Sequence, residues 1–169
     1  MFDGSLQAAV SNSIYSNINF KVKQVVCLQT IYRGRDVVAV LPMGYGKSMI
    51  FDLLPSLFLN KIKCKSRVAP SPVIIVVSPL NALIKDQIRL KEGNVKATVL
   101  SVKGENEDLE LDSRDANPTE LGDTKYEIVF ANPEAFLSCK KGIELLQSET
   151  YQQNVYAIVI NEAHCILEW

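Results

Sequence analysis

Residues 41–48 read Leu41-Pro42-Met43-Gly44-Tyr45-Gly46-Lys47-Ser48, a glycine-containing turn between two apolar segments. The upstream segment 37–41 is almost wholly apolar and rich in valine, which predicts a strand buried on both faces. Downstream, apolar residues recur at helical spacing from Met49 to Phe58. We therefore expect a strand, a tight turn and a helix in succession, which is the context of a phosphate-binding loop.

The chemistry of this turn favours a nucleoside triphosphate with Mg²⁺. Gly44 and Gly46 let successive backbone N–H groups converge on one concavity, and the positive end of the following helix adds to its attraction for phosphate. In such a loop Lys47 reaches the β- and γ-phosphates and the Ser48 hydroxyl binds Mg²⁺. The usual pattern has a glycine where this chain has Leu41, so a glycine-rich turn with an ordinary surface lysine is the alternative interpretation.

The composition is that of a single globular domain. The chain has 169 residues, of which 47% are hydrophobic and 22% are charged. Its four cysteines (Cys27, Cys64, Cys139 and Cys165) are scattered without a metal-type pair, which predicts reduced thiols in an intracellular protein. No apolar run has the length of a membrane span and the amino terminus lacks a secretory pattern, so we expect no membrane partner.

Charge is distributed unevenly along the sequence. Residues 104–124 contain eight acidic side chains and one basic side chain, a net charge of −7, whereas the whole chain carries −1. The remaining residues therefore carry +6, so a basic body is combined with an acidic segment. We expect this segment to be a solvated loop within the domain rather than a metal site.

The rest of the chain alternates between predicted helices and strands. A polar segment over 1–19 contains a short helix at 5–15, a second helix ends at Gly34, and Pro55 is expected to interrupt or restart the helix that follows the loop. Further strands are predicted at 73–77, 95–102, 127–131 and 156–160, and further helices at 82–90 and 133–138. This alternation predicts an α/β fold with a mostly parallel sheet covered by helices on both faces.

Polar clusters follow the predicted strands, where parallel sheets bind their ligands. Besides the loop, these clusters lie at 78–81, 132–134 and 161–164. Glu162, just past a buried strand, is placed to orient the water that attacks a γ-phosphate, and the position before it normally holds Mg²⁺. His164 is the only histidine, and a structural hydrogen bond is the alternative to a catalytic role.

Gln24 lies in the first turn of a predicted helix and has two interpretations. It is either an ordinary polar helix residue or an adenine reader, because a carboxamide donates and accepts together as the N6 and N7 edge of adenine requires.

Taken together, these residues give the chain a clear resemblance to the first RecA-like lobe of superfamily 2 helicases, most closely the RecQ family. The resemblance covers residues 20–169 and rests on five motifs in the family's order. They are the aromatic-plus-glutamine motif Phe20–Gln24, a variant phosphate loop at 41–48 that also lacks the first glycine, motif Ia at 76–80 with Lys85-Asp86-Gln87, a strand-end motif at 131–134, and a DEAH-like box at 161–166 with its cysteine.

The resemblance implies an ATP-dependent DNA helicase that uses ATP and Mg²⁺, moves 3′ to 5′ on DNA, works with a second RecA-like lobe, and is nuclear in a eukaryote. It implies a catalytic role for Lys47, Glu162 and His164. Nucleotide binding is expected from Gln24, Met43, Gly44, Tyr45, Gly46, Lys47 and Ser48. Ser48 and Asn161 are expected at the metal, and the weaker candidates for DNA contact are Ser78, Asn81, Lys85 and Asn132.

Two departures from the family pattern define the alternatives. Asn161 replaces the acidic residue expected at Mg²⁺, so a full negative charge is missing there. The sequence ends at Trp169, soon after the DEAH-like box, so we expect a fragment of a longer protein or a degenerate remnant. The leading alternative is thus a catalytically impaired module that binds ATP and DNA without hydrolysis, and a third is a phosphate-loop ATPase unrelated to nucleic acid.

Overall fold

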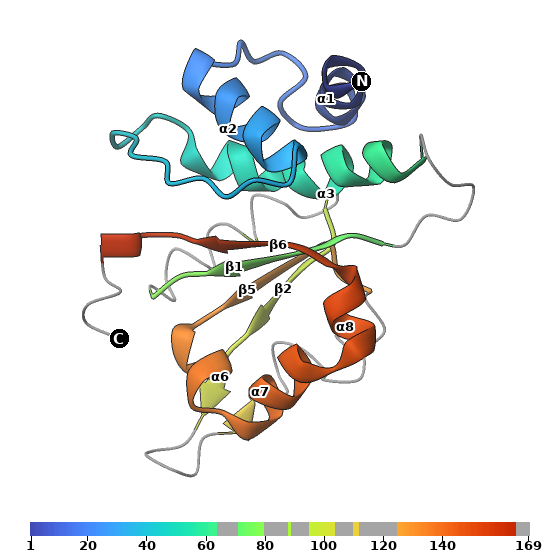
Figure 1. Ribbon diagram of the computed structural model, residues 1–169. Coiled ribbons are helices and arrows are strands. Elements are labelled where there is room, and N and C mark those ends of the chain that lie inside the picture. The colour runs from blue at the N-terminus through green and yellow to red at the C-terminus, as the bar shows by residue number, and fades with distance from the viewer. Residues whose placement is uncertain (64–70, 80–87, 89–94, 104–109, 112–124, 165–169) are drawn as a thin grey trace. The chain divides into compact units, whose positions relative to one another are not determined.

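The computed structural model describes residues 1–63, 71–79, 88, 95–103, 110–111 and 125–164 (Figure 1). The chain divides into two compact units, Met1–Pro70 and Ser71–Trp169. The first contains the phosphate loop and the second contains a parallel sheet.

The first unit contains three helices. They are α1 (Phe2–Ser11), α2 (Val22–Tyr32) and α3 (Lys47–Lys63), and α3 packs against both of the others. Phe2 and Tyr32 meet edge to face with ring centroids 5.4 Å apart, which joins α1 to the end of α2. Just beyond α2, Gly34 has a φ of +76°, the left-handed conformation common at helix ends.

Helix α3 continues through Pro55, so the expected interruption there is wrong. Proline within a helix costs about 3 kcal/mol because it lacks the N–H group and its ring crowds the preceding turn. Nine residues of α3 between Met49 and Phe58 are buried. Burying each large apolar side chain contributes about 1.5–3 kcal/mol, so the combined burial outweighs the proline.

Residues 37–41 form no strand, which contradicts the prediction of a buried strand before the loop. Val38 and Val40 are 94% and 85% exposed. The described residues of the first unit contain no strand, and a strand needs a hydrogen-bonded neighbour to form. An apolar run shows that a segment suits a sheet, but it does not supply the neighbour.

The second unit is built on a four-stranded, wholly parallel sheet. Its strands are β1 (Val73–Val77), β2 (Ala97–Leu100), β5 (Ile128–Ala131) and β6 (Val155–Ile160), arranged in the order β2-β5-β1-β6. In the register, Val77 lies opposite Ala131 on one side and Ile160 on the other, so three strands end level with one another. The predicted α/β class with a parallel sheet is confirmed, as are the strands at 73–77, 127–131 and 156–160 to within a residue.

The strand predicted at 95–102 is divided. After β2 ends at Leu100, β3 (Val102–Lys103) pairs antiparallel with β4 (Glu110–Leu111) in a separate two-stranded sheet. Two residues of the acidic segment are therefore in a strand rather than a loop. The rest of 104–124 and the helix predicted at 82–90, apart from the helical Ile88, lie outside the described residues.

Three short helices pack on one face of this sheet (Figure 1). They are α6 (Pro133–Leu137), α7 (Lys140–Gln147) and α8 (Glu149–Asn154). The core beneath them is formed by buried residues from both layers: Val73, Ile75, Leu100, Val129, Ala131, Ala135, Cys139 and Tyr151. A Cβ at Gly142 would lie 1.7 Å from the Ala135 carbonyl oxygen, so α6 and α7 approach closely because this residue is glycine.

Candidate nucleotide-binding site

The phosphate loop is shaped by two glycines in the left-handed region. Gly44 has a φ of +72° and Gly46 a φ of +85°, values that other residues adopt only with strain. The Tyr45 N–H group donates to the Pro42 carbonyl at 3.2 Å, which closes a tight turn. Met43 is 97% exposed at the tip of this turn. The chain thus makes the compact bend that a phosphate-binding nest requires.

Helix α3 begins at the loop's lysine. Lys47 is its first residue and Ser48 its second, and both side chains are half-buried. The first N–H groups of a helix have no partner within it, and the helix dipole places positive potential there. Lys47 adds a full positive charge at the same end. This arrangement fits a polyphosphate, and Ser48 offers a hydroxyl oxygen of the kind that binds Mg²⁺.

Gln24 joins the start of α2 to the loop. Its carboxamide is buried, with Oε1 accepting from the Lys21 N–H group at 2.8 Å. Its Nε2 atom donates to the carbonyl oxygens of Tyr45 at 2.9 Å and Gly46 at 3.2 Å. The structure therefore brings Gln24 into contact with the loop. The reading of adenine by Gln24 stays a prediction.

Lys21 makes a second link to the loop that the sequence analysis missed. Its Nζ atom lies 4.4 Å from the centroid of the Tyr45 ring, a cation–π distance. Lys21 and Tyr45 are separated by more than twenty residues. Only the aromatic-plus-glutamine motif, which ends three residues after Lys21, marked this region as functional.

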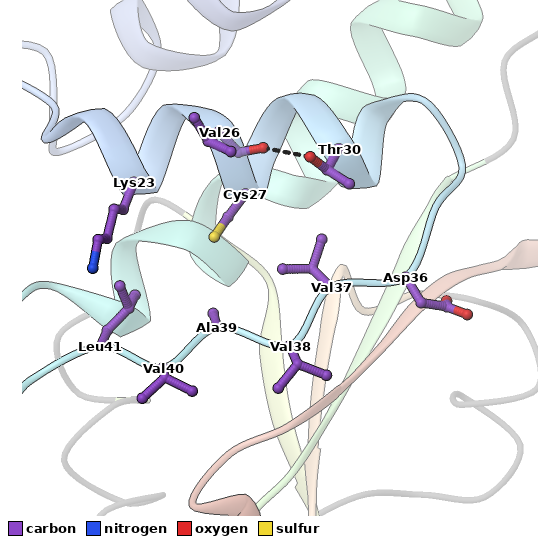
Figure 2. A pocket seen from close by; sticks show the side chains of 10 residues that line it. All are labelled: Lys23, Val26, Cys27, Thr30, Asp36, Val37, Val38, Ala39, Val40 and Leu41. Atoms are coloured by element: carbon purple, nitrogen blue, oxygen red, sulfur yellow. Dashed lines mark hydrogen bonds between the residues drawn. The ribbon is translucent and has the colours of Figure 1, made fainter.

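A pocket of about 410 Å³ lies between α2 and the extended segment 36–41 (Figure 2). Lys23, Val26, Cys27 and Thr30 line it from α2, and the Cys27 sulfur points toward the extended segment. Burial raises the pKa of the Cys27 thiol, which keeps it protonated at neutral pH. Cys27 and Cys139 are free thiols, as the sequence predicts for these two.

In the second unit, polar residues gather where neighbouring strands end. The Ser78 N–H group donates to the Ala131 carbonyl and the Asn161 N–H group to the Val77 carbonyl, each at 2.9 Å. Ser78, Asn132 and Asn161 therefore follow three adjacent strands at one edge of the sheet. Ser78 Oγ and Asn132 Oδ1 are buried, and within the described part of the chain neither has a hydrogen-bond partner. Of the other DNA candidates, Asn81 and Lys85 lie outside the described residues.

The turn after β6 carries the remaining predicted site residues. Glu162 has a φ of +58°, the only positive φ of a non-glycine residue among those described. Such a conformation costs about 1–2 kcal/mol, and strain of this kind is concentrated at functional sites. His164 Nδ1 lies 3.4 Å from a Glu162 carboxylate oxygen, and the His164 side chain is 74% exposed. The lone histidine therefore contacts the Glu162 carboxylate, and its catalytic role stays a prediction.

The described residues contain no group of three or more His, Cys, Asp or Glu side chains that would hold a metal on its own. Among the described helices, none combines the length and the apolar character needed to cross a membrane.

The fold agrees with what sequence comparison finds. A profile of the DEAD/DEAH box helicase family matches residues 21–169. Since this match covers most of the chain, the chain belongs to the DEAD/DEAH box helicase family.

Curated relatives extend the comparison to the RecQ helicases. The chain is 31% identical over 169 residues to the bifunctional 3′-5′ exonuclease/ATP-dependent helicase WRN of Mus musculus, an alignment that covers 97% of this chain and 10% of that protein. It is 30% identical over 159 residues to the ATP-dependent helicase wrn-1 of Caenorhabditis elegans, covering 94% of this chain and 13% of the relative. It is also 30% identical over 166 residues to the ATP-dependent DNA helicase RecQ of Synechocystis, covering 98% of this chain and 30% of the relative. The resemblance to the RecQ family is thereby confirmed, and the chain spans between 10% and 30% of the length of these relatives.

Proposed function

We propose that this chain binds ATP with Mg²⁺ on residues 43–48 and is the ATP-binding lobe of a RecQ-like DNA helicase that moves 3′ to 5′. The family match over residues 21–169 carries the proposal, because it joins the phosphate loop to the DEAH-like turn in one family. The left-handed glycines and the helix that begins at Lys47 support the nucleotide-binding part.

Each candidate residue has a defined task in this proposal. Lys47 neutralises the β- and γ-phosphates, and Ser48 and Asn161 provide oxygen atoms for Mg²⁺ or its bound water. Glu162 orients the attacking water, with His164 beside its carboxylate. Mg²⁺, when bound, neutralises the charge that develops on the transferred phosphoryl group.

DNA is the proposed partner at the strand ends of the second unit. Ser78 Oγ is buried at this edge, and the Ser78 hydroxyl and the Asn132 Nδ2 group can donate hydrogen bonds to phosphate oxygens. The net charge of +6 outside residues 104–124 supports binding to a polyanion. A second RecA-like lobe would complete the ATP site, and a nuclear location follows if the source is eukaryotic.

Replacing Lys47 tests the nucleotide site. Lys47→Ala should weaken ATP binding about tenfold or more, since charge-assisted hydrogen bonds are worth roughly 1.5–3 kcal/mol. Calorimetry with Mg²⁺ and ATP measures this. Lys63→Ala, an exposed lysine at the other end of α3, is the matched control and should bind as the original chain does. Equal affinity of the Lys47→Ala variant and the original chain would remove the phosphate-loop assignment.

The second candidate is a module that binds ATP and DNA without hydrolysis. Asn161 favours it, because this residue offers Mg²⁺ a dipole where a carboxylate would offer a charge. Stimulation of ATP turnover by single-stranded DNA separates the two. Turnover that rises with DNA supports the helicase lobe, whereas binding of both ligands without turnover supports the module.

A further inference from the structure

The carboxyl-terminal ends of α2 and α3 lie next to each other in the first unit. Lys61, near the end of α3, donates from Nζ to the carbonyl oxygen of Tyr32, the last residue of α2. The same ammonium group lies 4.6 Å from the centroid of the Tyr32 ring and 5.8 Å from that of the Phe58 ring, both cation–π distances. One lysine thus joins the two helix ends.

Three further basic residues lie within three positions of this contact. Arg33 and Arg35 follow α2, Lys63 is the last residue of α3, and all three are exposed. The backbone around the arginines is ordered, because the Arg33 N–H group donates to the Gln29 carbonyl at 3.1 Å and the Arg35 N–H group to the Thr30 carbonyl at 3.2 Å. We call Arg33, Arg35 and Lys63 the basic corner.

The positive charges of the basic corner are not balanced by neighbouring acids. Within the described part of the chain, none of its three side chains makes an ion pair, although Asp36 directly follows Arg35. Residues 1–63 contain seven basic side chains and three acidic ones. One of these acids, Asp52, is buried and accepts a hydrogen bond from the Tyr15 hydroxyl at 2.5 Å. The described residues of the first unit therefore carry a net charge of +4.

Helix dipoles explain the position of Lys61 but not the basic corner. The carboxyl-terminal end of a helix carries negative potential, and a cation that binds its last carbonyl groups is stabilising. Lys61 does this at α2. Among the described residues, no side chain of the basic corner donates a hydrogen bond to a backbone carbonyl. These three cations are therefore available to an external anion.

The surroundings of the basic corner favour a phosphate backbone over unpaired bases. Proteins hold single strands largely by stacking the bases on aromatic side chains. The aromatic rings nearby, Tyr32 and Phe58, are only 6% and 5% exposed, so they offer no stacking surface. A duplex keeps its bases inside and presents one phosphate charge per about 1.7 Å of its axis, so exposed cations bind it without reading its sequence.

We infer that the basic corner binds the phosphate backbone of duplex DNA, in addition to the contacts proposed at the strand ends of the second unit. The inference rests on the proposed function, because it takes DNA to be the partner. Such binding is independent of sequence, and it weakens as salt is added because each neutralised phosphate releases counterions.

The salt dependence of binding to a labelled blunt duplex tests this inference. Arg33→Gln, Arg35→Gln and Lys63→Gln together should make the logarithm of the affinity fall less steeply with the logarithm of the salt concentration. The slope changes by about 0.9 for each phosphate contact, so a change of about 2 to 3 is expected. Duplex affinity at about 0.1 M salt should fall at least about tenfold. Fluorescence anisotropy measures both quantities.

The matched control removes three positive charges from the second unit. Lys96→Gln, Lys140→Gln and Lys141→Gln together replace exposed lysines and should keep the original slope. A labelled single strand is the second control, and the triple glutamine variant of the basic corner should bind it as the original chain does.

A charge-conserving variant separates phosphate binding from a structural role. Arg33→Lys, Arg35→Lys and Lys63→Arg together retain every charge, so this variant should bind the duplex with the original slope. A loss of duplex binding in this variant as large as in the glutamine variant would contradict the inference, because charge would then not be the determinant.

Several other results would overturn the inference. They are an unchanged duplex slope in the glutamine variant, an equal change in the lysine control, and an equal loss of single-strand binding. Polyglutamate that displaces the duplex as effectively as unlabelled DNA would indicate an acidic protein segment as the partner instead. The proposed function fails separately. If the original chain binds the duplex through the basic corner but binds no single strand, the proposed strand-end contacts are wrong and the inference stands. Binding of neither form of DNA would contradict both.

Discussion

At the scale of single residues, the turn after β6 places a candidate catalytic carboxylate on a residue with a strained backbone. Glu162 adopts a left-handed conformation directly after Asn161, whose N–H group is bonded to the Val77 carbonyl. The end of β6 is thus fixed to β1, and the strained residue follows immediately. Strain of about 1–3 kcal/mol persists only where the surrounding structure enforces it. The backbone conformation of Glu162 is therefore held by the surrounding structure rather than by its local preference.

Asn161 carries the residue-scale prediction about hydrolysis. With a second RecA-like lobe supplied, Asn161→Asp should raise DNA-stimulated ATP turnover at least about fivefold while changing ATP affinity little. Mg²⁺ stabilises the charge that develops on the transferred phosphoryl group, and even in water two unit charges 4 Å apart interact with about 1 kcal/mol. Phosphate release in the presence of single-stranded DNA measures this. Glu162→Gln on the same background should abolish the gain, since the carboxylate that orients water is then missing.

The matched control is Asn12→Asp, an exposed asparagine at the end of α1, which should leave turnover unchanged. Unchanged turnover in Asn161→Asp as well would mean either that the site tolerates an amide at the metal or that hydrolysis is lost for another reason, and in both cases the account of Asn161 would be wrong.

At the scale of elements, the contact between α6 and α7 is set by a single glycine. Gly142 lies in α7 opposite the Ala135 carbonyl of α6. Gly142→Ala should lower the free energy of unfolding by about 1–3 kcal/mol, the usual cost of inserting a methyl group where there is no room. Denaturant unfolding followed by circular dichroism gives the difference.

Gly4 provides the opposite case on α1. No atom lies within 4 Å of a Cβ built there, so Gly4→Ala should stabilise the protein by up to about 1 kcal/mol, the helix preference of alanine over glycine. If both substitutions changed stability in the same direction and by the same amount, helix preference alone would explain them and the close contact at Gly142 would have no role.

The sequence predicted a strand correctly where the apolar segment has neighbouring strands to pair with in the sheet. β1 and β5 are continuous apolar runs buried in a parallel sheet, whereas β6 is an apolar run at its edge that stays partly exposed, so the prediction of a buried strand there is wrong although its position was located well. Segment 37–41 has the same pattern but no strand neighbour among the described residues of its unit. Similarly, Gln24 was recognisable as functional, but its bonds to Tyr45 and Gly46 depend on a turn that composition does not specify. The pattern of residues predicts which structure a segment can form, whereas the contacts that this segment makes depend on the rest of the chain.

At the scale of the whole molecule, the acidic segment 104–124 and the basic remainder of the chain predict how the affinity for DNA depends on charge and on salt. Replacing the acidic side chains of Glu105, Glu107, Asp108 and Asp112 by amides removes four negative charges from segment 104–124. Binding of single-stranded DNA should tighten several-fold at 50 mM salt and much less at 200 mM, because the repulsion is screened within about 10 Å at 0.1 M salt. Fluorescence anisotropy with a labelled oligonucleotide measures both.

The control removes the same number of charges elsewhere. Amide replacements at Asp3, Asp36, Glu144 and Glu149, all exposed, match the change in net charge. An equal gain in both variants would mean that only net charge matters and that the position of the acidic segment does not.

The strand order has a consequence for synthesis of the chain on the ribosome. β1 lies between β5 and β6, which follow it by about fifty and eighty residues, so Val73–Val77 leaves the ribosome long before either neighbour exists. At synthesis rates of roughly 5–20 residues per second, this strand waits several seconds with both edges unpaired. A nascent Val-Ile-Ile-Val-Val segment in that state is a natural substrate for chaperones and is prone to aggregate.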